Sequence, residues 1–202
     1  MEEYNKYKNI IREKLSEKRY RHSLCVADSA VELAKIHGGG DNHLIEKAYI
    51  AGLLHDIMKD AGSENQLREI LSAIKRYKNT LGIFNIDELT MHTSKLLHAP
   101  AGAAYMHREL GIADPELLAA VRYHTTARAG MSLLEKVVYA ADFISADRIY
   151  PDVYVMRAIA PVSLNQAMRY ALCYTIRDLA EKGTPIHPDT VSAFNQCVIN
   201  DL

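Results

Sequence analysis

Hydrophobic side chains recur every three to four residues along most of the chain, which is the spacing of amphipathic helices. The pattern appears over residues 10–15 and again over residues 24–34, so we predict two helices, with His22 in the first turn of the second. The glycine run 38–40 ends the second helix, and Asp41 is positioned to cap the next one. The chain therefore begins with helices rather than strands.

The helix that follows is apolar on most sides over residues 48–54, as expected for a helix buried at the centre of a bundle. It stops before residues 60–62, which end in a glycine. Ser63 and Gln66 fit a capping box that opens a short helix. Residues 75–97 are more polar and less periodic, and we expect a lid or a pair of short helices there.

Further apolar periods, punctuated by proline and glycine, predict the helices of the second half. They run from the turn that holds Pro100 to about residue 110, from 114 to about 124, over 133–144, over 162–181, and beyond Pro188. No repeat and no strand pair is recognisable. We predict an all-α helical bundle formed by one domain over residues 1–202, with a core at about 18–147 and C-terminal helices at 162–200 packed on it.

Composition and charge narrow the class of protein. Of the 202 residues, 49% are hydrophobic and 24% are charged, which suits a globular chain with a substantial core. The formal net charge is -1, so no overall field favours nucleic acid. The N-terminus has no apolar signal region, and no apolar run reaches the roughly 18 residues that a membrane span needs. Three cysteines without a CxxC pair indicate a reducing compartment, and we expect a cytoplasmic protein.

The pair His55-Asp56, at the end of the apolar helix, is the strongest chemical signal. Both side chains donate to divalent metals, and both are costly to bury unless something satisfies them. Residues of the same types sit at other predicted helix ends or on apolar faces: His22, His98, His124 and Asp142. Alone, His22 fits a surface or capping histidine, and Asp142 fits a partner of Tyr139. Together the set predicts a metal centre, as in a metal-dependent hydrolase.

Several segments, taken in order, carry a closer resemblance. They are Tyr20 to Ser23, Gly52 to Asp60, Leu97 to Ala103, Arg122 to Thr126 with Arg128 to Met131, Ala141 to Ile144, and Ile186 to Thr190. The series is similar to that of the YqeK-type proteins of the HD superfamily of metal-dependent phosphohydrolases, and it covers nearly the whole chain. Phe143, Ser145 and Ala146 differ from the residues that the family usually has at these positions. The difference concerns the surroundings of the ligands and not the ligands themselves.

The resemblance implies a symmetrical bis(5'-nucleosyl)-tetraphosphatase, which splits diadenosine tetraphosphate into two ADP molecules by attack of a metal-activated water on a β-phosphorus. It also implies an all-helical HD domain, an iron ion and, in many members, a homodimer. Carried over by motif, the metal ligands are His22, His55, Asp56 and Asp142. From the donor types alone, iron, manganese, cobalt and zinc all remain open.

The same regions supply candidate substrate contacts. Lys59 follows Asp56 by one helical turn, and we expect it to act in catalysis as a point charge that meets the polyphosphate. We assign His98 and His124 to phosphate contact and proton transfer, with ligation of a second metal as the alternative. Further expected contacts to a dinucleoside polyphosphate or ADP are His22, Asp56, Thr125, Asp142, Arg148 and Arg177. For Arg148 the alternative is a salt bridge to Asp147 or Asp152, and for Arg177 it is a solvated helix face.

Two other functions remain open on the sequence. The chain is compatible with another HD-type nucleotide phosphohydrolase or phosphodiesterase, and with a nucleotide-binding sensor that does not turn over its ligand. The five remaining histidines stand in polar surroundings or beside glycine or proline, and we assign no role to them: His37, His43, His92, His107 and His187.

Overall fold

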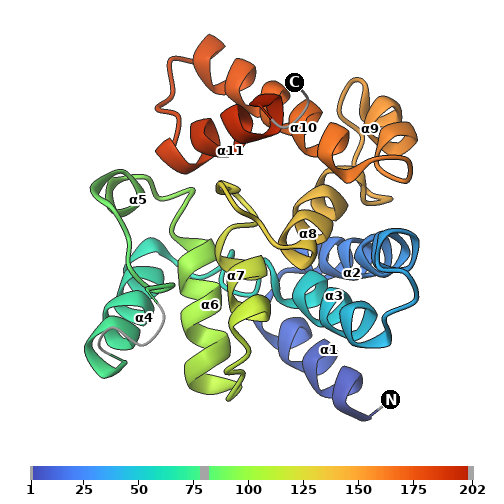
Figure 1. Ribbon diagram of the computed structural model, residues 1–202. Helices are drawn as coiled ribbons and strands as arrows, with labels where there is room; N and C mark the ends of the chain where they lie inside the picture. Colours follow the sequence, from blue (N-terminus) through green and yellow to red (C-terminus); the bar gives the residue numbers. More distant parts are fainter. Residues whose placement is uncertain (1, 78–81, 200–202) are drawn as a thin grey trace.

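The computed structural model describes residues 2–77 and 82–199, and this part of the chain folds into eleven helices without a strand (Figure 1). The helices are α1 (Glu2–Lys14), α2 (Glu17–His37), α3 (Asn42–Leu54), α4 (Ser63–Arg76), α5 (Glu88–His92), α6 (His98–Glu109), α7 (Pro115–Arg122), α8 (Leu133–Ile144), α9 (Val153–Ile159), α10 (Leu164–Glu181) and α11 (Pro188–Ile199). The prediction of an all-α protein is confirmed. None of the described helices is both long and apolar enough to cross a membrane.

Helix α3 packs on α1, α2, α7 and α8 (Figure 1), and its last four residues are buried. Its residues Leu53 and Leu54 are fully buried, and burial of each leucine side chain contributes roughly 1.5–3 kcal/mol. The approach to α2 is especially close, because a Cβ atom on Gly52 would lie 2.7 Å from the Cα atom of Ala27. The prediction of a buried central helix is confirmed, and Gly52 is the residue that lets α2 and α3 come together.

Two helix starts differ from the prediction. Helix α2 starts early enough to place His22 in its second turn rather than its first. Helix α4 has Gly62 in the N-cap position and no side-chain cap, so the capping box predicted at Ser63 is wrong. Gln66 instead donates from Nε2 to the carbonyl oxygen of Met58 at 2.9 Å. This hydrogen bond ties α4 to the turn that follows α3.

The polar segment 75–97 contains one short helix, α5, within its described part. Positions 78–81, on which the predicted lid partly falls, lie outside the described residues. Ile83 and Phe84 pack into the hydrophobic core, and Thr90 on α5 is 1% exposed. The described part of the segment is thus anchored to the rest of the protein, and a lid stays a prediction.

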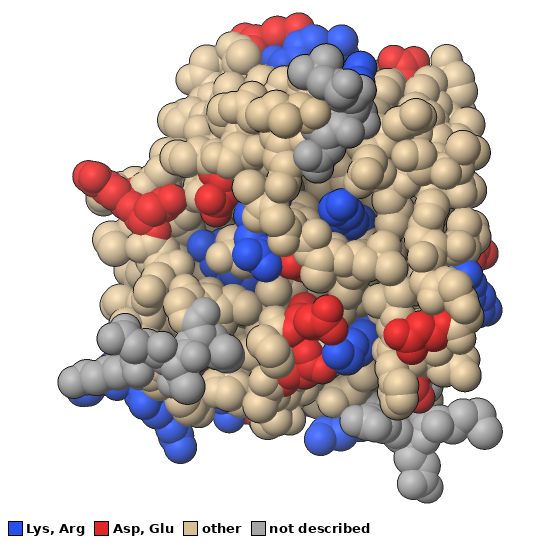
Figure 2. All heavy atoms as spheres, in the orientation of Figure 1, with Lys and Arg blue, Asp and Glu red and all other residues tan. Residues whose placement is uncertain are grey.

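Helices α9, α10 and α11 follow one another at one end of the molecule (Figure 1). Helix α10 packs on α8, α9 and α11. Figure 2 shows one face of the whole molecule, on which basic and acidic side chains stand in small, interspersed groups. The face drawn there is not a continuous basic surface of the kind that nucleic acids bind.

Candidate metal centre

Five segments far apart in the sequence meet around the turn that follows α3. They contribute the residues that we call the histidine–aspartate cluster: His22 from α2, His55 and Asp56 from the turn after α3, His98 from the start of α6, His124 from the turn after α7, and Asp142 from α8. The first five of these residues are less than 5% exposed. The structure therefore brings together the four predicted metal ligands and the two predicted catalytic histidines.

Asp56 stands at the centre of the histidine–aspartate cluster. Ligand atoms of His22, His55 and Asp56 lie within 4.8 Å of one another, and so do ligand atoms of Asp56, His98 and His124. The Nε2 atom of His22 lies 2.9 Å from Oδ1 of Asp142. Two atoms bound to one metal at about 2.1 Å and at right angles are about 3 Å apart. His22 and Asp142 are thus spaced as ligands of one ion would be.

Backbone carbonyls select the tautomer of two of these histidines. The Nδ1 atom of His55 lies 2.7 Å from the carbonyl oxygen of Gly52, and the Nδ1 atom of His124 lies 2.7 Å from that of Val121. A carbonyl oxygen only accepts hydrogen bonds, so each Nδ1 donates and each Nε2 keeps its lone pair. The Nε2 atoms are therefore the ones available to a metal or a phosphate.

A carboxylate orients His22 in the same way. Its Nδ1 atom lies 2.8 Å from Oδ2 of Asp147, and the buried hydroxyl of Ser145 donates to the other oxygen of Asp147 at 2.8 Å. Sequence reasoning considered Asp147 only as a partner of Arg148 and missed this contact. The signal was weak, because a carboxylate just beyond a helix end has many ordinary uses.

Two buried polar atoms of the cluster have no hydrogen-bond partner among the described residues: Nε2 of His55 and Oδ1 of Asp56. Buried polar groups are normally paired, so two unpaired atoms side by side indicate that a further partner binds between them. Imidazole nitrogen and carboxylate oxygen are ligands of iron, manganese, cobalt and zinc. The residues present therefore fit a divalent metal ion.

Burial and neighbouring charges set the protonation of the cluster. Burial lowers the pKa of His55 to about 4, so its ring is neutral at pH 7. Burial and the charge of Lys59 also hold the pKa of His98 well below its usual value. Burial alone would raise the pKa of Asp56, but its polar neighbours, His55 foremost and the cation Lys59 among them, hold that pKa well below its usual range. His55 and Asp56 are thus in the deprotonated forms that metal binding requires.

Two cations flank Asp56. The Nη1 atom of Arg19 lies 3.2 Å from Oδ2 of Asp56, and Nζ of Lys59 lies 3.7 Å from Oδ1. Lys59 also lies 2.9 Å from Nε2 of His98, and burial lowers its pKa. Sequence reasoning missed Arg19. Its place three residues before His22, on the same face of one helix, was the signal that would have found it.

A third cation, Arg148, lies beside Asp142, and we call Arg19, Lys59 and Arg148 the cationic rim. Arg148 donates from Nε to the carbonyl oxygen of Asp142 at 2.8 Å and from Nη2 to the carboxylate of the same residue. The alternative partners proposed for it, Asp147 and Asp152, are therefore wrong. The side chains of Arg19, Lys59 and Arg148 are 35%, 27% and 37% exposed, so they stand between the buried cluster and solvent.

Thr125 joins the two predicted catalytic histidines. Its Oγ1 atom lies 3.1 Å from Nε2 of His98 and 3.1 Å from Nε2 of His124, and these two nitrogens are 3.2 Å apart. Together with Lys59, these side chains form one connected polar group beside Asp56. A phosphate group at this position would meet several polar partners at once.

A family model described as the HD domain matches residues 19–147, which hold every residue of the histidine–aspartate cluster. The chain belongs to the HD domain family. Its HD relatives extend the likeness to nearly the whole chain. It is 36% identical to a symmetrical bis(5'-nucleosyl)-tetraphosphatase of Halalkalibacterium halodurans over 94% of each chain. It is 37% identical to the enzyme of that name from Bacillus subtilis, over 93% of this chain and 94% of the relative.

A solved structure of an HD superfamily hydrolase shows the same architecture. The protein comes from Clostridium acetobutylicum and is described as involved in NAD metabolism. It matches this chain with a TM-score of 0.85 and 36% sequence identity, over 98% of this chain and 97% of that one. The likeness therefore includes the helices that follow the HD match.

Two residues beyond the HD match differ in their surroundings. The side chain of Arg177 on α10 is 66% exposed, and its described contacts are with Glu181 and Tyr174 of the same helix. Substrate contact by Arg177 therefore stays a prediction. His187, which stands beside Pro188 and was given no role from the sequence, is 4% exposed and contacts Thr90. The neighbouring prolines and polar residues gave no sign of this tertiary burial.

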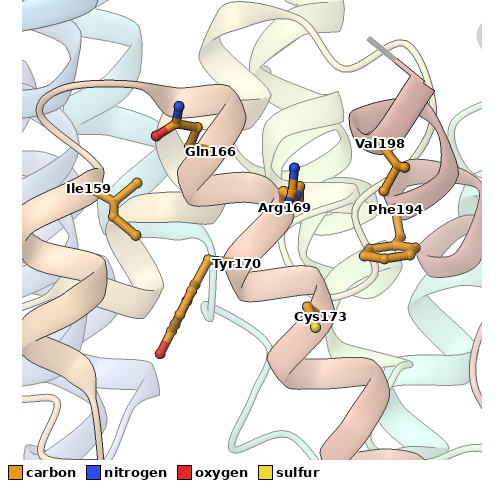
Figure 3. A pocket seen from close by; sticks show the side chains of 7 residues that line it. All are labelled: Ile159, Gln166, Arg169, Tyr170, Cys173, Phe194 and Val198. Atoms are coloured by element: carbon orange, nitrogen blue, oxygen red, sulfur yellow. The ribbon is translucent and has the colours of Figure 1, made fainter. Parts of the chain in front are cut away.

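A hollow of about 810 Å³ lies among α9, α10 and α11, beyond the HD match (Figure 3). Its walls are formed by Ile159, Gln166, Arg169, Tyr170, Cys173, Phe194 and Val198. These residues include no histidine and no carboxylate. The hollow therefore lacks the ligand types that distinguish the histidine–aspartate cluster.

Proposed function

We propose that this HD protein is a symmetrical bis(5'-nucleosyl)-tetraphosphatase that hydrolyses diadenosine tetraphosphate to two ADP molecules. The observation that carries the proposal is its 36% and 37% identity to two enzymes of that name over more than nine-tenths of each chain. The buried histidine–aspartate cluster and its cationic rim support the same function, because metal-dependent attack on a polyphosphate needs both.

Iron is our proposal for the metal, held by His22, His55, Asp56 and Asp142. The donor set of two imidazoles and two carboxylates suits iron, and it also suits manganese, cobalt and zinc. When bound, the ion would supply Lewis-acid polarisation of a phosphoryl oxygen and lower the pKa of water. Reconstitution with each metal in turn, followed by metal analysis and activity assays, will rank them.

The cationic rim is proposed to bind the polyphosphate. Arg19, Lys59 and Arg148 each contact a carboxylate of the cluster and remain partly exposed, so an approaching anion meets them first. Arginine offers a phosphate two parallel hydrogen bonds, whereas lysine acts as a point charge. The leaving ADP is an anion of low basicity. Neutralising charge therefore contributes more than strong acid catalysis.

His98, His124 and Thr125 are proposed to contact the phosphate that water attacks. The Nδ1 atom of His124 is occupied by a backbone carbonyl, so Nε2 is the atom that faces His98 and Thr125. The lowered pKa of His98 keeps its ring neutral, and Lys59 lies within hydrogen-bond distance of it. This pair can hold or release a proton beside the substrate.

Product analysis tests the proposal. Diadenosine tetraphosphate is incubated with protein reconstituted anaerobically with Fe(II), and the nucleotides are separated by chromatography. Two ADP molecules per substrate are expected. ATP plus AMP would contradict the symmetrical cut, and no products from iron-loaded protein would favour another nucleotide phosphohydrolase or a sensor.

Substitution of the ligands gives the matching control. We expect Asp56→Ala and His55→Ala to lose both bound metal and turnover, because each removes a ligand from the buried cluster. Asp28→Asn changes an exposed carboxylate on α2 and should keep both. Full activity in either ligand variant would overturn the assignment of the metal centre.

A homodimer, a cytoplasmic location and one domain over residues 1–202 complete the proposal. The dimer rests on the family resemblance and is measured by light scattering after gel filtration. The three cysteines form no disulfide, which agrees with a reducing compartment. Contacts of α10 with α8 support the packing of helices 162–200 on the core at 18–147. A single unfolding transition is the test of one domain.

A further inference from the structure

Two hydrogen bonds join helix α11 to the loop that follows α7, and we call them the grip of α11. The hydroxyl of Thr190 donates to the carbonyl oxygen of Thr126 at 2.8 Å. The side chain of Gln196 accepts from the backbone N–H of Gly130 at 2.6 Å. The two contacts come from positions six residues apart on α11 and hold the loop 124–131 near both of its ends.

This loop needs external support. It carries His124 and Thr125, whose side chains contact His98. Between the two points gripped by α11 lies Ala127, a buried alanine with a φ of 57°, in the left-handed region that residues with a Cβ atom rarely adopt. Such a conformation persists where the surrounding structure imposes it.

The start of α11 is itself fixed to a different part of the chain. The Nε2 atom of His187 lies 2.8 Å from Oδ2 of Asp87 and 3.1 Å from the hydroxyl of Thr90. Its Nδ1 atom accepts from the backbone N–H of Asp189 at 3.1 Å. His187, Thr90 and Thr190 are each less than 5% exposed. The grip therefore starts from a buried, hydrogen-bonded anchor.

We propose that α11 is a positioning element for the reaction, with Thr190 and Gln196 as its positioning residues. They hold the loop 124–131 so that His124 and Thr125 face the phosphate. Both residues lie beyond the HD match at 19–147, so the C-terminal helix supplies what the HD core lacks. The inference rests on the proposed function, because it assigns a task to contacts that the proposed reaction uses.

The expected signature follows from what α11 does and does not touch. Its grip reaches the loop of His124 and Thr125, and it makes no described contact with the proposed ligands His22 and Asp142. Loosening the grip should therefore misalign the phosphate contacts while the metal stays bound. Misplacement by about 1 Å can cost about 100-fold in rate, and the loss appears in kcat rather than KM when ground-state binding is kept.

The experiment compares paired variants of the full-length, metal-loaded protein with diadenosine tetraphosphate as substrate. Thr190→Val removes the hydroxyl at nearly constant shape, and Thr190→Ser retains it. We expect Thr190→Val to lower kcat by about 10-fold or more with KM changed by less than about 2-fold, and Thr190→Ser to restore kcat. Ser192→Ala, at an exposed position of the same helix, should match the wild type. Metal content should be equal in all four proteins.

A second pair keeps the test independent of folding at the buried threonine. Gln196 is exposed, so Gln196→Met removes the acceptor for Gly130 without opening the core, and Gln196→Glu keeps an acceptor. A lower kcat for Gln196→Met than for Gln196→Glu is expected. Equal kcat within both pairs, or loss of metal in place of loss of kcat, would overturn the positioning role. Absence of ADP from the wild type would instead overturn the proposed function.

Discussion

A single side-chain contact decides which nitrogen of His22 faces the centre of the cluster. The partner is Asp147, which is in turn held by the hydroxyl of Ser145. A carboxylate on the far nitrogen of a metal-binding imidazole fixes its orientation and raises its basicity. The role of His22 as a ligand is therefore linked to a residue that takes no direct part in the ligand set.

Asp147→Ala should weaken metal binding by about 10- to 100-fold, because the ring of His22 loses its partner and its preferred tautomer. Competition with a chelator measures the affinity, and metal analysis gives the stoichiometry. Asp28→Asn, which changes an exposed carboxylate on the same helix as His22, is the control. Unchanged affinity in Asp147→Ala would show that the contact with Asp147 does not support His22.

At the scale of residues, the sequence predicted the ligands better than their supports. His55 and Asp56 could be found because a buried polar pair at the end of an apolar helix is unusual in the sequence itself. Arg19, Asp147 and His187 could not, because ordinary local surroundings hide contacts formed over 37, 125 and 97 residues of chain.

The ligands of the cluster come from different helices, so its geometry depends on how these helices pack. Helices α2 and α3 supply His22 and the segment ending in His55, and they meet where Gly52 faces Ala27. The absence of a side chain at Gly52 sets the distance between the two helices. Packing of the elements thus controls the spacing of the ligands.

Gly52→Ala should destabilise the protein by about 1–3 kcal/mol, because its Cβ atom would lie 2.7 Å from the backbone of α2 and force the helices apart. Urea unfolding of the metal-free protein measures the change in free energy. A Cβ atom on Gly62 would meet no atom within 4 Å, and its φ of -58° is allowed for alanine, so Gly62→Ala is the matched control. Equal stabilities of the two variants would contradict this account of the contact.

The sequence predicted which segments form helices more reliably than it predicted the residues at which those helices start. The apolar period marked the long helices because burial of one face depends on that spacing. The capping box expected at Ser63 did not form. The side chain of Gln66 instead donates to the carbonyl oxygen of Met58, which belongs to the turn before α4. A local signal of a few residues is easily outweighed by a tertiary hydrogen bond.

On the scale of the whole molecule, the buried cluster links folding to pH. The pKa of His55 is lowered by burial to about 4, from 6.5, and that of His98 is also lowered. The unfolded chain then binds more protons than the folded one between about pH 6.5 and 4, so the free energy of unfolding decreases as the pH falls through this window. His22 acts in the opposite direction, because its contact with Asp142 outweighs burial and raises its pKa.

The metal-free protein should therefore lose stability as the pH falls from 6.5 to 4. The lowered pKa values of His55 and His98 should together change the free energy of unfolding more than the raised pKa of His22 does. A shift as large as that of His55 corresponds to about 3 kcal/mol when fully expressed. Urea unfolding of chelator-treated protein at pH 7.5 and pH 5 measures the loss, and the variant His55→Asn should show a smaller one. Stability that rises on acidification would mean that His22 dominates the balance.

One consequence concerns how the metal centre can change under mutation. His55 and His124 are oriented by backbone carbonyls of residues 52 and 121, and every amino acid supplies the same carbonyl. Substitution at those positions leaves the orienting carbonyl in place, so the tautomer of these two rings depends on no side chain. His22 depends on a side chain, and the segment 145–148 is thus where the preference of the centre for one metal over another is open to selection or to engineering without replacing a ligand.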